Sequence, residues 1–136
     1  MSARVVQRYV LQSVDDSRLA VFVVWEKIGA NDSLEAARQA TALLPDSRVR
    51  FFWSETQAAG KAFQRAVGIQ GTPAWDVFLV YEIGKDWSGD APPSPVFFMH
   101  NQPKHSELPQ DRLFNGNRLA AKIKSILAQD ASGTGP

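Results

Sequence analysis

The chain has 136 residues, of which 44% are hydrophobic and 21% charged, as expected for one soluble globular domain with a buried core. Fifteen Lys and Arg against 14 Asp and Glu give a net charge of +1, so no strong field favours a nucleic-acid partner. The absence of cysteine excludes disulfides, thiolate nucleophiles, cysteine-ligated zinc and iron–sulfur clusters. We therefore expect a single domain at residues 1–129 that has no dithiol redox chemistry of its own.

The sequence shows neither a membrane span nor a secretion signal. Its longest strongly apolar run, residues 19–25, is far shorter than the roughly 20 residues that a transmembrane helix needs. Residues 1–12 have no apolar signal core and no cleavage site. We therefore expect a cytoplasmic protein with no membrane partner.

Three strands are expected in the first half of the chain. Residues 4–11 (RVVQRYVL) are β-branched and aromatic, which predicts the first strand. Residues 19–25 are apolar without alternation, which predicts a central strand covered on both faces. The side chains of residues 48–53 alternate between two sides, which predicts the third strand.

Two helices are expected beside these strands. Residues 32–35 (DSLE) fit a capping box with Asp32 as the N-cap, and Pro45 ends the helical spacing that follows. Residues 54–57 (SETQ) fit a second capping box, before a helix that should end at Gly68.

The second half of the chain predicts two strands and a helix. Residues 75–81 and 95–100 have no helix between them, which suggests an antiparallel pair. An amphipathic helix should follow Gly116, and residues 130–136 should form a disordered tail. The apolar face of that helix comprises Leu119, Ala120, Ile123, Ile126 and Leu127.

The resulting order, β-β-α-β-α-β-β-α, and residues 67–73 (VGIQGTP) directly before a strand resemble the thioredoxin-like superfamily. The resemblance implies an α/β fold, a three-layer α/β/α sandwich with a mixed central sheet, and a cis-proline at Pro73. Gly29 and Asp32 take the positions of the two cysteines of that family, so its redox activity does not carry over. Three further phrases resemble uncharacterised bacterial proteins with a degenerate layout of this kind, at residues 23–26, 75–77 and 93–100.

In thioredoxin-like proteins, the loop before the first helix and the cis-proline hold an extended peptide. The resemblance therefore implies a binding groove at the matching positions. Asp32 in this groove is expected to cap a helix, because a carboxylate that is bonded to backbone amides is a poor general base. The tryptophans at the strand ends either stack on a ligand or fill the space of the missing disulfide. The candidate residues are Trp25, Glu26, Lys27, Ile28, Asp32, Thr72, Pro73 and Trp75.

The two histidines, His100 and His105, stand near Glu107 and Asp111 in the sequence. Imidazole and carboxylate together can bind metals, but this spacing matches no known metal motif. We therefore expect a solvated loop, no metal site and no cofactor. A Ser/His/Asp triad is not expected either, because both histidines fall in one loop.

These features favour a redox-inactive thioredoxin-fold protein that binds a peptide or protein segment at the loop and cis-proline face, more than they favour an enzyme. One alternative is a glutathione-type binder or cofactor-dependent enzyme that uses the backbone beside the proline. Another is a structural subunit that dimerises through an exposed strand or Trp87. The oligomeric state is left open.

Overall fold

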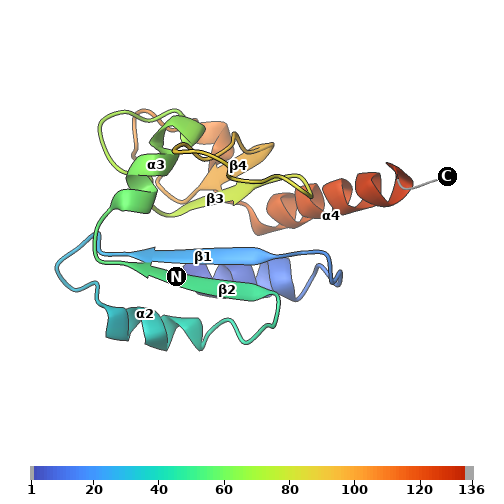
Figure 1. The fold of residues 1–136 in the computed structure, drawn as a ribbon, viewed down its shortest axis with the longest axis horizontal. Helices are drawn as coiled ribbons and strands as arrows, with labels where there is room; N and C mark the ends of the chain where they lie inside the picture. The colour runs from blue at the N-terminus through green and yellow to red at the C-terminus, as the bar shows by residue number, and fades with distance from the viewer. Residues whose placement is uncertain (1, 134–136) are drawn as a thin grey trace.

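The computed structural model describes residues 2–133 and has a mixed α/β fold (Figure 1). Its elements are α1 (Ser2–Val5), η1 (Val6–Leu11), β1 (Val21–Glu26), α2 (Leu34–Thr41), β2 (Val49–Ser54), α3 (Ala58–Val67), β3 (Val77–Val80), β4 (Phe97–His100), η2 (Gln110–Arg112) and α4 (Gly116–Gly133). The described strands form two sheets of two strands each, with β1 parallel to β2 and β3 antiparallel to β4. The α/β class and the antiparallel pair are confirmed, whereas the single mixed sheet of a three-layer sandwich is not.

The N-terminal helical segment, formed by α1 and η1, replaces the strand predicted at residues 4–11, so that prediction is wrong. Ala3, Val6 and Val10 recur every three to four residues, which places them on one face of a helix. Ala3 and Leu11 pack toward β2, whereas Val10 packs toward α4. Burial on two sides outweighs the strand preference of the β-branched residues.

The β1–β2 sheet is covered on one face only. Val23, Trp25 and Phe51 pack against the N-terminal helical segment, which lies behind the two strands in Figure 1. Phe22 and Phe52 point to the other face and are exposed. The prediction that residues 19–25 form a strand covered on both faces is therefore wrong, because no helix of the described chain buries these two rings.

The β3–β4 sheet lies between two helices. Phe78 and Val80 pack in the cluster that α4 completes, and Val77 and Leu79 pack in the cluster that α3 completes. This alternation follows from the period of two in a strand.

Within residues 2–133, no helix is long and apolar enough to cross a membrane.

The C-terminal helix is longer than the sequence predicts. It begins at Gly116, as expected, but continues through Gly133. Residues 130–133 are therefore helical where a disordered tail was predicted. The remaining part of that predicted tail, residues 134–136, lies outside the described residues.

The start of α2 differs from the predicted capping box. Ser33 is the N-cap, and its Oγ accepts a hydrogen bond from the amide of Ala36 at 3.1 Å. The Asp32 carboxylate instead accepts hydrogen bonds from the amides of Ile28 at 3.1 Å and Gly29 at 2.7 Å. Asp32 therefore folds the loop back on itself, and the adjacent serine caps the helix.

Arg48 joins the end of the N-terminal helical segment to the start of β2. Its guanidinium donates to the carbonyls of Leu11 at 2.8 Å and Val14 at 2.5 Å, and pairs with Asp46 at 2.7 Å. The last carbonyls of a helix lack intrahelical donors and favour a nearby cation. The half-buried Arg48 therefore satisfies groups that the fold would otherwise leave unpaired.

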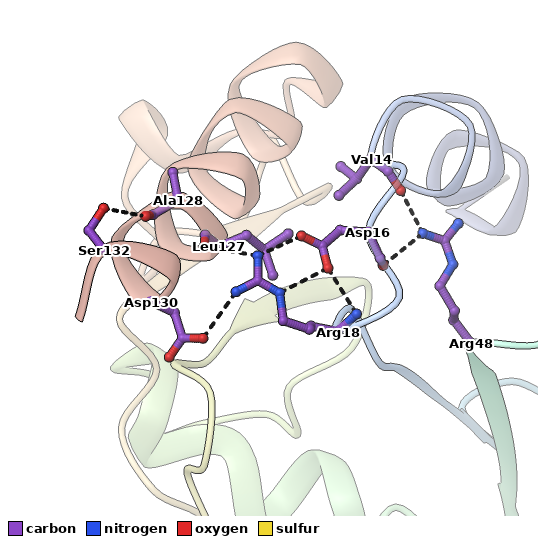
Figure 2. Close-up of polar contacts among 8 residues, drawn as sticks. All are labelled: Val14, Asp16, Arg18, Arg48, Leu127, Ala128, Asp130 and Ser132. Carbon is purple, nitrogen blue, oxygen red and sulfur yellow. Dashed lines mark hydrogen bonds and ion pairs between the residues drawn. The ribbon is translucent and has the colours of Figure 1, made fainter. Parts of the chain in front are cut away.

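Arg18 makes a second link, between the loop after that segment and α4. Figure 2 shows its guanidinium between Asp16 and Asp130. It also donates to the carbonyl of Leu127 at 3.1 Å. Two arginines thus hold residues 14–18 against both β2 and α4.

The substitution Arg48→Met should destabilise the fold. It keeps most of the side-chain volume but removes the donor to the carbonyls of Leu11 and Val14 and the guanidinium that pairs with Asp46, which should lower the free energy of unfolding by about 2–3 kcal/mol. Urea denaturation measures this loss. Arg50→Met, on an exposed position of the same strand, is the control and should cost less than about 0.5 kcal/mol. Equal, small losses in both variants would contradict the role of Arg48.

The same ion pairs predict a loss of stability in acid. Hydrogen bonds from Arg48 lower the pKa of Asp46 from 3.8 to about 2, and those from Arg18 do the same for Asp16. Since both pKa values are depressed in the folded state, this stability is complete above about pH 4 and is lost as the pH falls toward about 2. The urea midpoint of the wild type should decrease over this interval, and that of Asp46→Asn should decrease less. An equally steep decrease in Asp46→Asn would show that the pair does not contribute.

Candidate binding site

Glu26, the last residue of β1, caps the start of α3. Its carboxylate accepts hydrogen bonds from the amides of Ala59 and Gly60, each at 2.9 Å. Gln57 makes no side-chain cap, so the capping box predicted at residues 54–57 does not form. A carboxylate at this end of a helix is favourable because it meets free N–H groups and the positive end of the dipole. Glu26 is therefore engaged within the fold and is not a free residue of the predicted groove.

Gly60 brings the proline segment next to Glu26. The amide of Ala74 donates to the carbonyl of Gly60 at 2.9 Å. A Cβ atom at Gly60 would lie 2.6 Å from the Ala74 oxygen and 2.9 Å from both Glu26 Oε2 and Pro73 Cβ. Only glycine permits this approach. The structure thus brings together two predicted site residues, Glu26 and Pro73, around a third residue that the sequence analysis did not single out.

Pro73 follows a trans peptide bond, since no cis bond occurs within residues 2–133. The prediction of a cis-proline is therefore wrong. The Thr72 carbonyl accepts a hydrogen bond from Gln64 Nε2 at 2.8 Å, and Ala74 is bonded to Gly60. These contacts hold residues 72–74 in place with Pro73 in the trans form, which most X-Pro bonds adopt.

His105 and Thr72 do not form an activated nucleophile. Nδ1 of His105 accepts a hydrogen bond from the amide of Glu107 at 3.2 Å, which in a neutral ring assigns the proton to Nε2. Nε2 lies 3.1 Å from Thr72 Oγ1 and therefore donates to it. The Glu107 carboxylate accepts from the amides of Gln70 and Gly71 and does not orient the ring. This arrangement closes a loop and offers no general base.

His100 is fully buried, so a solvated loop was the wrong prediction for it. Its Nδ1 accepts a hydrogen bond from the amide of Gln102 at 3.3 Å, and its Nε2 lies 2.9 Å from the carbonyl of Pro109. Both ring nitrogens are thus used within the fold. Among the described residues, no group of three or more His, Cys, Asp or Glu side chains is placed to hold a metal ion.

Ile28 and Trp75 are the two predicted site residues that expose large apolar side chains, with 38% and 45% of their surface accessible. Ile28 lies two residues after Glu26, and Trp75 lies two residues after Pro73. Each therefore follows closely, along the chain, a residue that Gly60 approaches. Trp25 differs, because it packs in the cluster beneath the β1–β2 sheet.

The remaining predicted residues play smaller parts. The amide of Lys27 pairs with the carbonyl of Ser54 at 3.2 Å, and the Lys27 side chain is exposed. Gln102, which the sequence analysis missed, is buried, and its Nε2 donates to the carbonyl of Trp75. A buried glutamine gives no distinct sequence signal, whereas a glycine within the first turn of α3 could have marked the close approach at Gly60.

The comparisons with known proteins give no further assignment. No protein-family model matches the sequence, and neither the curated proteins nor the solved structures contain a significant match. The interpretation of the site therefore depends on its own geometry.

The substitution Gly60→Ala tests the close approach at the junction. A helix gains up to about 1 kcal/mol from alanine in place of glycine. The clash with the Ala74 oxygen and Pro73 should exceed this gain and lower the free energy of unfolding by about 1–2 kcal/mol, measured in urea. Gly89→Ala meets no atom within 4 Å and is the control. Unchanged or increased stability of Gly60→Ala would show that the three segments do not meet as described.

Proposed function

We propose that the protein acts by binding an extended peptide or protein segment where β1, α3 and residues 72–75 meet, with Ile28 and Trp75 as apolar contacts. The observation that carries this proposal is the exposure of both side chains, each two residues along the chain from a residue that meets Gly60. Binding energy in protein interfaces is concentrated in a few aromatic and apolar anchors on rigid support. An isoleucine and a tryptophan on two joined segments have this character.

Rigid support for the two anchors favours binding. The Asp32 carboxylate holds the amide of Ile28 at 3.1 Å, and Gln102 holds the carbonyl of Trp75. Glu26 fixes the loop before Ile28 to α3 through its two hydrogen bonds. Anchors whose backbone is already ordered lose less conformational entropy when a ligand binds.

The polar groups at this junction support binding better than catalysis. Glu26 and Asp32 already accept backbone hydrogen bonds, and His105 donates to Thr72. The expected peptide groove and the glutathione-type alternative both relied on a cis-proline, whereas Pro73 is trans, so the proposal depends on the exposed Ile28 and Trp75 instead. Kinship with the thioredoxin-like superfamily and with its bacterial members stays a prediction.

Selection from a displayed library of random peptides on the immobilised protein tests this proposal. Trp75→Ala should weaken the affinity of the selected peptides by about tenfold or more, as expected for an aromatic anchor. Trp87→Ala is a matched control, because Trp87 is 48% exposed and Trp75 45%, and it should change the affinity little. Fluorescence anisotropy measures both dissociation constants. If no peptide is selected, or if both variants bind as tightly as the wild type, the proposal is wrong.

A further inference from the structure

The backbone at Trp75 is held in an unusual conformation by the residues that follow β4. Asp76 has a φ of 52°, in the left-handed region that residues other than glycine rarely adopt. The amide of Asn101 donates to the carbonyl of Asp76 at 3.0 Å, and Gln102 Nε2 donates to the carbonyl of Trp75. Such a conformation persists only where the surrounding contacts hold it. The conformation of residues 75–76 therefore depends on the position of Gln102.

His100 in turn holds Gln102. Its Nδ1 accepts a hydrogen bond from the amide of Gln102 at 3.3 Å. Its Nε2 lies 2.9 Å from the carbonyl of Pro109, which can only accept, so Nε2 carries the ring proton. The ring is fully buried, and both of its nitrogens are bonded to backbone groups. The position of Gln102 therefore depends on a free lone pair at Nδ1 of a neutral ring.

A second proton on this ring would break the link to Gln102. Protonated Nδ1 can only donate, and its hydrogen would point at the amide hydrogen of Gln102. The charge would also be buried, which is unfavourable and favours a movement of the ring toward solvent. Histidine is the side chain that ordinarily changes charge between about pH 5 and 8. Mild acid should therefore displace residues 100–102.

The segments that pack against His100 carry further titratable groups. The Glu107 carboxylate already accepts hydrogen bonds from two backbone amides, and Asp111 lies 4.0 Å from Arg112. His105 titrates in the same range of pH as His100, so the two histidines have to be separated by experiment. The groups on β3, on η2 and on the loop after β4 are Asp76, His105, Glu107, Asp111 and Arg112.

We propose that His100 is a pH-sensitive switch for Trp75, so that the site binds its peptide at neutral pH and releases it in mild acid. The binding part of this inference rests on the proposed function, whereas the coupling of His100 to Trp75 does not. In the neutral ring, Nδ1 fixes Gln102, and Gln102 fixes Trp75. In the protonated ring, Gln102 is displaced, Asp76 leaves the left-handed conformation and Trp75 turns away. The peptide then loses its aromatic contact.

An NMR titration of the full chain without ligand tests the switch. Between about pH 8 and pH 5, the ring nitrogens of His100 should titrate, and the signals of the Gln102 amide and the Trp75 indole should shift with the same midpoint. Hydrogen bonds from arginines lower the pKa of Asp16 and of Asp46 to about 2. The loss of those ion pairs therefore occurs in stronger acid and does not produce this response.

The substitution His105→Gln is the control, because it removes the other of the two histidines and should leave the response unchanged. A His100 ring that stays neutral down to about pH 5 would overturn the inference. A ring that titrates while the Trp75 signals stay constant would overturn it too, as would a response that disappears in His105→Gln.

Peptide affinity tests the consequence for binding. A selected peptide without histidine, aspartate or glutamate should bind the wild type about fivefold or more weakly at about pH 5 than at about pH 8, measured by fluorescence anisotropy. Gln102→Met keeps most of the side-chain volume but cannot hold the Trp75 carbonyl. This variant should bind weakly at both pH values, without the pH dependence.

Equal affinities of the wild type at both pH values, or a pH dependence that Gln102→Met retains, would contradict the switch. If no peptide is selected, the proposed function fails. The NMR titration then still decides whether His100 controls Trp75, so the two failures are distinguishable.

Discussion

The two halves of the structure depend on the helical segment at the N-terminus and on Arg48, which binds the last residue of that segment. Ala3 and Leu11 belong to the cluster under the β1–β2 sheet, whereas Val10 and Val14 belong to the cluster that α4 forms with β3 and β4. Arg48 fixes the end of this segment to β2 by donating to the carbonyl of Leu11, its last residue, and to that of Val14 in the loop that follows. The β1–β2 sheet is therefore anchored from behind, and Phe22 and Phe52 on its other face are exposed.

Local sequence patterns predicted most helices and strands, but they failed where contacts between residues far apart in the sequence determine the structure. The strand near residues 48–53, the antiparallel pair and the end of α3 at Gly68 follow from alternation and turn chemistry, and all are present. The strand prediction for residues 4–11 failed because their valines favour strands. Ala3, Val6 and Val10 also have helical spacing, and burial of this segment against both clusters favours the helix. The apolar residues 19–25 look fully buried in the sequence, yet only the packing of the helices decides that one face stays bare.

The sequence predicted the location of the candidate site better than the roles of its residues. The expected neighbourhood of the β1 end and the proline segment exists, but Glu26 caps α3, Pro73 is trans and Trp25 packs beneath the sheet. The contact of Glu26 with Gly60 spans 34 positions, so no local pattern reveals it. What the structure adds is exposure, since Ile28 and Trp75 present apolar surface to solvent.

The central claim is that the described residues form two separate small sheets, in which β1 pairs with β2 alone. Amide hydrogen exchange within β1, followed by NMR, measures this directly. The amides of Val23 and Trp25, which face β2, should exchange slowly, and those of Phe22 and Val24 should exchange about a hundredfold faster or more. Slow exchange at all four positions would show that another strand pairs with the other edge of β1, and it would contradict the account.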